Sequence, residues 1–153
     1  MQQTSSTEAT VIKLTFDIAP VAQARPRATR FGKGIRLYDP KPVRTYKDQL
    51  WLAARTAYEG DPLEGPLKVT ARFYRPIQTS ESKKRHRLKA TGAIRPTKKP
   101  DLDNYIKSTL DGLNGVLWGD DNQIVELNTK KYYSDKPRVE IEVEELKLKL
   151  TKQ

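Results

Sequence analysis

Strict alternation of apolar and polar residues in GPLKVTARFY, residues 65–74, constrains the fold more than any other feature of the chain. Successive side chains of a strand point to opposite faces, so this pattern predicts a strand with one buried face and one face free for charge. Three further segments are predicted to be strands, and they are residues 11–18, 124–133 and 138–146. A sheet with one apolar face needs a second layer of structure to cover it.

Two longer segments have the spacing of amphipathic helices. Residues 43–58 follow a proline and end before a Gly-Asp-Pro turn, and residues 101–116 carry leucine and isoleucine at helical intervals. A shorter helix is predicted from a cap at Ser80 to about Ala90. The order of these elements predicts an α+β fold, a single domain in which one layer of helices packs on a small mixed β-sheet.

The length and composition favour one cytoplasmic domain. The chain of 153 residues suffices for a single modest core, which we assign to residues 11–147. Residues 1–10 are expected to be a disordered leader and residues 148–153 a frayed tail. No apolar run is long enough to cross a membrane. Cysteine is absent, which excludes disulfides and thiolate zinc sites, and a histidine-built metal site or a Ser-His-Asp triad would depend on His86 alone.

Positive charge is concentrated in the first two thirds of the chain. Residues 1–100 contain 21 Lys and Arg against 8 Asp and Glu, whereas residues 101–153 contain 8 against 11. The whole chain has a formal net charge of +10. A basic surface joined to an acidic segment is typical of a protein that binds a polyanion and acts on it.

Two basic tracts are the candidates for contact with DNA phosphates. The first is a long loop at residues 19–42, which has room for a short hairpin around Gly32–Gly34, and the second is residues 75–99. The candidate DNA-binding residues are Arg25, Arg27, Arg30, Lys33, Lys83, Lys84, Arg85, Arg87, Lys98 and Lys99. Such loops bind the DNA backbone without reading sequence. Packing is favoured over base stacking for four aromatic residues, Tyr38, Tyr46, Trp51 and Tyr74.

Acidic residues gather at both ends of the segment KKPDLDNYIKSTLDGLNGVLWGDDNQ. Asp101 and Asp103 stand at the start of the predicted helix, where the backbone is not yet held at helical angles and the two side chains can converge. Lys107 lies one turn beyond Asp103 on the same helix face. An Asp-Asp pair at positions 120–121 follows the helix in a turn. The spacing therefore allows carboxylates and one lysine to meet at a single place.

Each of these features also has a structural explanation. Carboxylates in a first helical turn are favoured by the helix dipole, Asp103 and Lys107 can form a surface ion pair, and Asp-Asp-Asn is common in turns. Together, however, they supply hard oxygen ligands beside a lysine in a protein built to attract polyanions. Magnesium-assisted phosphoryl chemistry uses this residue set. We therefore favour a metal site, with Asp111 and Asp120 in supporting places.

The segment KPDLDNYIKSTLDGLNGVLWGDDNQIVEL resembles the RusA family of Holliday junction resolvases, which occurs in bacteria and prophages. The shared features are an Asp-Leu-Asp-Asn segment, a lysine four residues after its second aspartate, and an Asp-Asp pair after a tryptophan. By this resemblance the catalytic, metal-binding aspartates are Asp101, Asp103 and Asp121. The essential lysine is Lys107, and Asp120 is a secondary acidic residue.

The resemblance also implies an activity and its partners. It implies a homodimeric, RusA-like endonuclease that binds four-way or branched DNA and uses Mg²⁺, for which Mn²⁺ can substitute. Such an enzyme introduces paired nicks in strands of like polarity during DNA recombination and repair, and it would work in the cytoplasm on nucleoid DNA. The basic tract at residues 78–99 has no clear counterpart in the family. Leu117 and Trp118 have two open roles, packing at a dimer interface or closing the site.

Two other functions are open on the sequence alone. Pro100-Asp101 followed by Glu145-Leu146-Lys147 loosely matches the PD-ExK pattern of restriction-type nucleases, but that pattern leaves the lysine and the other aspartates unexplained. A non-catalytic basic DNA-binding module would explain the charge, yet it has no need of carboxylates that repel phosphate.

Overall fold

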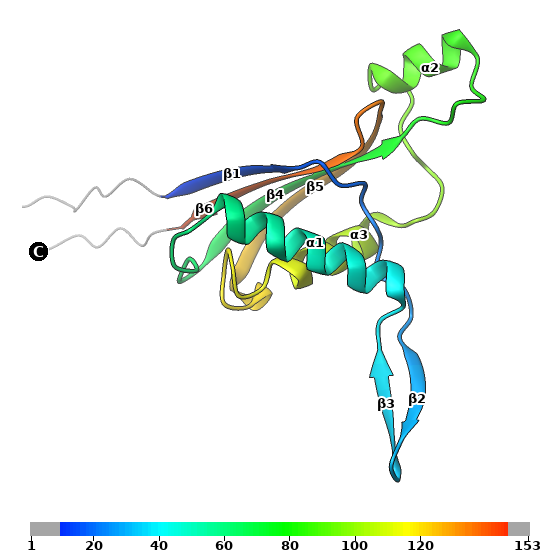
Figure 1. The fold of residues 1–153 in the computed structure, drawn as a ribbon. Helices are drawn as coiled ribbons and strands as arrows, with labels where there is room; N and C mark the ends of the chain where they lie inside the picture. Colours follow the sequence, from blue (N-terminus) through cyan, green and yellow to red (C-terminus); the bar gives the residue numbers. More distant parts are fainter. Residues whose placement is uncertain (1–9, 147–153) are drawn as a thin grey trace, which may run out of the picture.

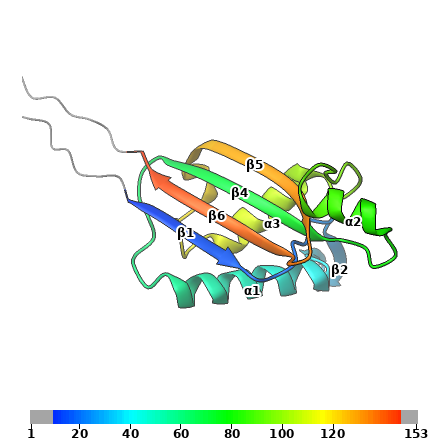
Figure 2. The ribbon, with the colours of Figure 1, turned by 90° about the horizontal axis from the view of Figure 1, so that it is seen from above.

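The computed structural model describes residues 10–146, which form two layers, a four-stranded sheet and two long helices against one of its faces (Figure 1). The strands are β1 (Val11–Phe16), β4 (Leu67–Pro76), β5 (Ile124–Ser134) and β6 (Arg138–Glu145), in the order β1-β6-β4-β5. Strand β6 pairs antiparallel with β1 and β4, whereas β4 and β5 run parallel. The helices α1 (Lys41–Ala57) and α3 (Leu102–Leu113) lie beneath the sheet (Figure 2). The predicted α+β domain with a mixed sheet is confirmed.

The alternation that predicted β4 forms the basis of the core. The buried side chains that alternate along the two central strands are Leu67, Val69, Ala71 and Phe73 of β4 with Val139, Ile141 and Val143 of β6. Phe73 stacks on Tyr105 of α3 with ring centroids 5.2 Å apart, which joins the two layers. Tyr46 of α1 is buried and shares a 2.7 Å hydrogen bond with Thr109 of α3. Tyr46 is therefore a core residue, as favoured from the sequence.

Helix α3 ends three residues earlier than predicted. The backbone leaves helical angles at Asn114, whose ψ is 137°, and Gly115 follows with a φ of +84°, a conformation that glycine adopts easily. The chain then turns inward, so that Leu117 and Trp118 are 0% exposed and Trp118 Nε1 donates a 2.7 Å hydrogen bond to Asn114 Oδ1. Both roles considered for Leu117 and Trp118 are wrong, because the two side chains lie in the core of the protomer.

A two-stranded hairpin occupies most of the first basic tract. Strands β2 (Arg27–Phe31) and β3 (Gly34–Tyr38) pair antiparallel, and Gly32 takes a φ of +58° in the turn. The hairpin projects away from the sheet and the helices (Figure 1), and every residue of both strands is exposed. The long loop thus contains the short hairpin for which its glycines left room.

The second basic tract forms a surface helix, α2 (Lys83–Ala90). Its cap is Ser82, whose Oγ accepts a 3.2 Å hydrogen bond from Arg85 N, so the predicted cap at Ser80 is wrong. Arg85 Nε donates a 3.0 Å hydrogen bond to Glu81, and Lys89 donates another. The Lys89 ammonium also lies over the ring of Tyr133 and is almost fully buried. Some of the positive charge in this tract therefore holds the helix in place.

Two predictions about the ends of the chain lie largely outside the described residues. Of the expected leader only Thr10 is described, and the expected tail at 148–153 lies beyond residue 146. Within residues 10–146, no helix is long and apolar enough to cross a membrane.

Candidate active site

A hollow of about 690 Å³ lies where α1, α3 and the root of the β2–β3 hairpin meet. We call it the lysine hollow, because Lys47 and Lys107 both line it. Its other lining residues are Gln23, Ala24, Arg25, Pro26, Asp39, Asn104, Asp111 and Asp121. Two predicted catalytic residues, Lys107 and Asp121, therefore line one hollow although they stand at opposite ends of the acidic segment.

Helix α3 supplies three of these side chains because of its period. Asn104, Lys107 and Asp111 are three and four residues apart, so they share one face of the helix. Ile106 and Leu110 pack in the core from another face. The amphipathic pattern that packs α3 on the sheet thus also directs its polar residues toward the hollow.

Asp121 reaches the hollow from a short 3₁₀ turn, η1 (Asp121–Gln123), that precedes β5. Gln123 holds this turn in place through both the oxygen and the nitrogen of its side-chain amide. Its Oε1 accepts hydrogen bonds from Gly119 N and Asp120 N at 2.8 and 3.2 Å. Its Nε2 donates to the carbonyl oxygens of Leu63 and Gly65 at 2.9 and 3.1 Å. Gln123 therefore positions Asp121, while the exposed Asp120 is the cap of the turn.

The carboxyl group of Asp121 lies in surroundings that disfavour its charged form. Burial raises its pKa above the ordinary aspartate value, and the negative charges of Asp120 and Asp111 raise it further. A cation beside this carboxylate would offset the burial and the repulsion. The electrostatics of Asp121 are therefore those of a group suited to binding positive charge.

Lys47 lines the hollow and pairs its positive charge with two aspartates there. Its Nζ donates hydrogen bonds of 2.7 Å to both Asp39 and Asp111. Burial acts to lower the pKa of Lys47, but the hydrogen bonds to Asp111 and Asp39 outweigh it and the pKa is raised. The same hydrogen bond from Lys47 lowers the pKa of Asp39. Asp111 is thus paired with a lysine of the protein, whereas Asp121 forms no ion pair among residues 10–146.

Lys107 differs from Lys47 in having no such partner. Its side chain is exposed at the hollow, and among residues 10–146 it takes part in no ion pair. The surface pair with Asp103, considered above as a structural explanation for Lys107, is not formed. Its ammonium group is therefore available to an anion that enters the hollow.

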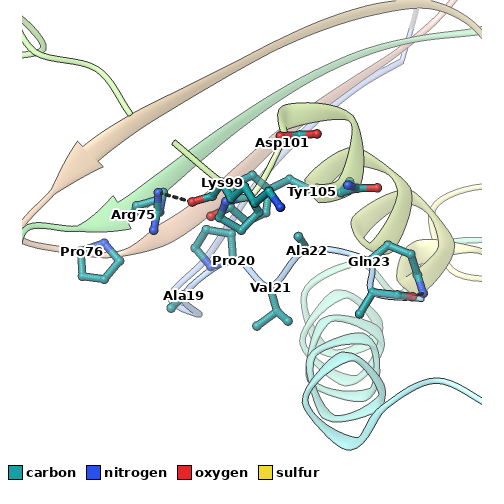
Figure 3. A pocket seen from close by; sticks show the side chains of 13 residues that line it. Ala19, Pro20, Val21, Ala22, Gln23, Arg75, Pro76, Lys99, Asp101 and Tyr105 are labelled. Carbon is teal, nitrogen blue, oxygen red and sulfur yellow. Dashed lines mark hydrogen bonds between the residues drawn. The ribbon is translucent and has the colours of Figure 1, made fainter. Parts of the chain in front are cut away.

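Asp101 lines a second hollow, of about 850 Å³, which borders the first and is shown in Figure 3. We call it the Asp101 hollow, and its lining is largely apolar, from Ala19, Pro20, Val21, Ala22, Pro76, Pro100 and Tyr105, with Arg75 and Lys99. Residues 19–24 are fastened to α3 by two hydrogen bonds. Gln23 N donates to Asn104 O at 2.8 Å, and Ser108 Oγ donates to Val21 O at 2.6 Å. Gln23 and Asn104 line both hollows, so this contact forms their border.

The chain that leads into α3 is held by the ends of β4 and β5. Arg75 Nη1 donates a 3.1 Å hydrogen bond to the carbonyl oxygen of Lys99, and Lys131 Nζ donates to those of Lys98 and Pro100 at 3.2 and 2.9 Å. These bonds use the backbone and leave the side chains of Lys98 and Lys99 exposed beside Asp101. The predicted phosphate contacts at Lys98 and Lys99 are thus geometrically open.

The predicted metal ligands do not form one cluster in this structure. Asp103 is exposed in the first turn of α3 and lines neither hollow. Within residues 10–146, no three His, Asp or Glu side chains lie close enough together to hold a metal ion. The donor set fits Mg²⁺ or Mn²⁺ in its chemistry, because carboxylate oxygens are the ligands these ions prefer. In geometry it is not a preformed site with three carboxylates.

The restriction-type alternative fails on geometry. Glu145 pairs with Leu67 at one end of β4, whereas Asp101 lines a hollow together with Arg75 and Pro76 at the other end. Those ends are nine residue steps apart along β4, roughly 30 Å. A PD-ExK site would need these two carboxylates side by side, so this reading is wrong.

Comparison with known proteins decides the family. The sequence model of the family Endodeoxyribonuclease RusA matches residues 17–144, which include every candidate site residue. The chain belongs to the RusA endodeoxyribonuclease family. The chain is 28% identical over 132 residues to the crossover junction endodeoxyribonuclease rusA of Lactococcus phage r1t, covering 86% of this chain and 94% of the phage protein. It is also 37% identical over 137 residues to the uncharacterised protein YqaN of Bacillus subtilis (strain 168), covering 88% and 96%.

Membership of the RusA family places this chain among nucleases, the Holliday junction resolvases that act on branched DNA. It therefore favours an enzyme over a non-catalytic binding module. Sequence reasoning did not find Lys47 or Asp39 in the RusA-like site, because Lys47 and Asp111 are 64 positions apart and no local pattern links them. A signal for Gln123 was present, because a glutamine three residues after a capping aspartate is typical of a capping box.

Proposed function

We propose that this protein is a metal-dependent, structure-specific endodeoxyribonuclease that resolves four-way DNA junctions by paired nicks, in DNA recombination and repair. The observation that carries the proposal is the meeting of Lys107 and Asp121 in one hollow at the root of a basic hairpin. The unpartnered lysine suits a phosphate, and the carboxylate with a raised pKa suits a cation.

The residues have distinct roles in this proposal. Asp101, Asp103 and Asp121 hold Mg²⁺ or Mn²⁺, and Asp120 supports them through the turn that it caps. Bound there, the ion would polarise the scissile phosphoryl group and lower the pKa of a water molecule. Lys107 binds the same phosphate through its ammonium and stabilises the negative charge that develops on it. Because Asp101 lines the neighbouring hollow and Asp103 lines neither hollow, both side chains must approach Asp121 when metal and DNA bind.

DNA binding in this proposal comes from basic side chains around the two hollows. Arg25 lines the lysine hollow itself, and Lys99 lines the Asp101 hollow. The remaining candidates are exposed and lie on the hairpin, on α2 and in the segment before α3, and they are Arg27, Arg30, Lys33, Lys83, Lys84, Arg85, Arg87 and Lys98. Contacts of this kind bind the backbone of DNA and position it without reading base sequence.

A homodimer is part of the same proposal. Paired nicks in two opposed strands of a junction need two active sites, and each protomer contributes one set of Asp101, Asp103, Lys107 and Asp121. A two-fold symmetric dimer would present these sites to the two equivalent strands of a four-way junction. Sedimentation at several protein concentrations, with and without a junction, measures the stoichiometry directly.

A junction-cleavage assay tests the proposed function. Four-way junctions with each strand end-labelled in turn are incubated with the parent protein and with Asp103→Asn, in EDTA, Mg²⁺ or Mn²⁺, and the cuts are mapped. We expect symmetric cuts by the parent with metal, none in EDTA and none by Asp103→Asn, which should still bind the junction. Asp48→Asn, a change at an exposed aspartate of α1 outside both hollows, is the matched control and should cut normally. Tight binding without cutting in either metal would instead support the non-catalytic binding module.

A further inference from the structure

The β2–β3 hairpin, which we call the arm (Arg27–Tyr38), exposes large apolar side chains to solvent. Phe31 is 68% exposed, Ile35 74% and Leu37 67%. The arm extends away from the rest of the protomer (Figure 1), so the described part of the chain does not cover these side chains. An exposed apolar surface on a hairpin is an aggregation hazard unless a partner covers it.

The strand register places the two most exposed apolar side chains on opposite faces near the tip. Phe31 is opposite Gly34, and Ile35 is opposite Arg30 in the next pair. Because neighbouring pairs in a ladder point to opposite faces, Phe31 projects from one face and Ile35 from the other. The tip of the arm is therefore apolar on both sides, as a wedge is.

Positive charge surrounds this apolar tip. Residues 25–38 contain five basic residues and no acidic residue, and the basic residues are Arg25, Arg27, Arg30, Lys33 and Arg36. The guanidinium of Arg36 lies over the ring of Phe31, 5.9 Å from its centroid. The partner of the arm must therefore be anionic on its outside and apolar within.

Charge complementarity selects DNA over a second copy of this chain as that partner. Residues 25–38 of another copy also carry five basic residues and no acidic residue, so two arms would repel each other. DNA supplies phosphates for the arginines, and its apolar surface consists of the flat faces of the bases. Neighbouring base pairs cover these faces in a continuous duplex, whereas base pairs at a branch point can expose them. Phenylalanine and isoleucine side chains are known to enter between base steps in this way.

The root of the arm also forms part of the lysine hollow. Arg25 and Pro26, just before β2, and Asp39, just after β3, line the hollow together with Lys107 and Asp121. Asp39 is fixed there by hydrogen bonds from Lys47 at 2.7 Å and from Gln23 at 2.9 Å. DNA held by the arm is therefore presented to the hollow rather than to a distant surface.

The structure assigns to the arm the recognition of the branch point itself, an inference that rests on the proposed function. Phe31 and Ile35 stack on the two base-pair faces that open at the centre of a branched DNA, while the surrounding arginines bind the converging phosphates. The apolar tip thus favours branched over linear DNA, and the basic residues bind both.

Binding experiments in EDTA separate this assignment from the nuclease activity. A four-way junction with 2-aminopurine beside the branch point and a linear duplex of the same sequence are titrated with the parent, Phe31→Ala and Ile35→Thr. We expect each variant to lose about fivefold or more of its affinity for the junction and to keep its affinity for the duplex. The 2-aminopurine fluorescence should rise with the parent, because the base unstacks, and should rise less with Phe31→Ala.

The matched control is Leu52→Ala, which removes an apolar side chain that is 63% exposed on α1. It should leave both affinities and the fluorescence change as in the parent. Equal losses on junction and duplex in Phe31→Ala, or no loss on either, would overturn the assignment. A smaller sedimenting species in Phe31→Ala than in the parent would also overturn it, because the arm would then be a contact between copies. Branch-selective binding without any cutting would disprove the proposed nuclease and leave this assignment standing.

Discussion

The lysine hollow and the arm both carry strong charge, but the structure holds the charge of the two regions in opposite ways. In the hollow, Lys47 is hydrogen-bonded to two aspartates, and the pKa of Asp121 is raised by burial and by its acidic neighbours. On the arm, among the described residues, no arginine or lysine has an acidic partner.

This difference corresponds to two different tasks. Charges that are paired and partly buried keep a fixed geometry, which chemistry at a phosphate requires. Charges that are exposed and unpaired stay available to a polyanion that arrives from solution. Lys107 lines the hollow, yet its side chain is exposed and, among the described residues, has no acidic partner, as on the arm. Variants in the hollow should therefore change catalysis or stability, and variants on the arm should change affinity.

The largest effect is expected for Asp121→Asn, which changes the hollow and leaves the arm intact. Junction cleavage should fall on the order of 10³-fold, and junction binding should be retained. The variant should also unfold at a higher urea concentration than the parent at pH 7. The pKa of Asp121 is raised in the folded state, so its charged form opposes folding above the pKa of the unfolded chain, and asparagine removes that penalty.

A metal titration checks the same change independently of activity. Mg²⁺ or Mn²⁺ should raise the thermal midpoint of the parent, because a ligand that binds only the folded state stabilises it. The midpoint of Asp121→Asn should respond less, and that of the Asp48→Asn control should respond as in the parent. Parental cleavage by Asp121→Asn would show that the hollow is not the active site.

A smaller effect is expected for Lys107→Ala. The turnover number should fall about 10²-fold, because an ammonium group that stabilises charge on the phosphate is lost. The thermal midpoint should not change, since Lys107 has no ion pair to lose within the described structure. Single-turnover cleavage at saturating enzyme separates turnover from binding. Weaker binding with unchanged turnover would instead show that Lys107 contributes to DNA affinity, as the arm residues do, and not to catalysis.

On the arm, the double change Arg27→Gln with Arg30→Gln should weaken the binding of junction and duplex alike, by about tenfold. The slope of log affinity against log salt should become shallower by up to about two, because two phosphate contacts are lost. The matched control is Arg55→Gln, an exposed arginine in the last turn of α1. An unchanged salt slope would remove the arm from the DNA surface.

The smallest effect is expected for Lys47→Ala, which should cost about 1 kcal/mol of unfolding free energy. The lowered pKa of Asp39 stabilises the fold above the unfolded aspartate pKa, and this stability is lost as the pH falls through the lowered value. The raised pKa of Lys47 stabilises below the unfolded lysine pKa and is lost as the pH rises through the raised value.

Parent and variant should therefore differ most between about pH 4 and pH 10 and converge outside that window. Urea unfolding across this range measures the difference. A constant difference at every pH would mean that Lys47 contributes packing rather than charge.

Local patterns predicted most of the elements, because the spacing of apolar residues along a strand or a helix shows which of its sides faces the core. The prediction of β4 from residues 65–74 is an example, since the same alternation is buried in the structure. Local patterns failed where two signals competed within a few residues. Apolar spacing continues past Leu113 and predicted a longer α3, but the backbone leaves helical angles at Asn114 and turns at Gly115. Ser80 and Ser82 are both possible caps, and only Ser82 is used.

By itself the sequence determined the α+β domain and the candidate set Asp101, Asp103, Lys107 and Asp121, because that set lies in one segment with an interpretable spacing. The tertiary structure alone decided which of these residues share a hollow. It joined Lys107 and Asp121, placed Asp101 across the border formed by Gln23 and Asn104, and brought Lys47 to Asp111. It also decided that the basic hairpin stands free of the body. These outcomes depend on contacts between residues far apart in the chain, and local periodicity carries no record of such contacts.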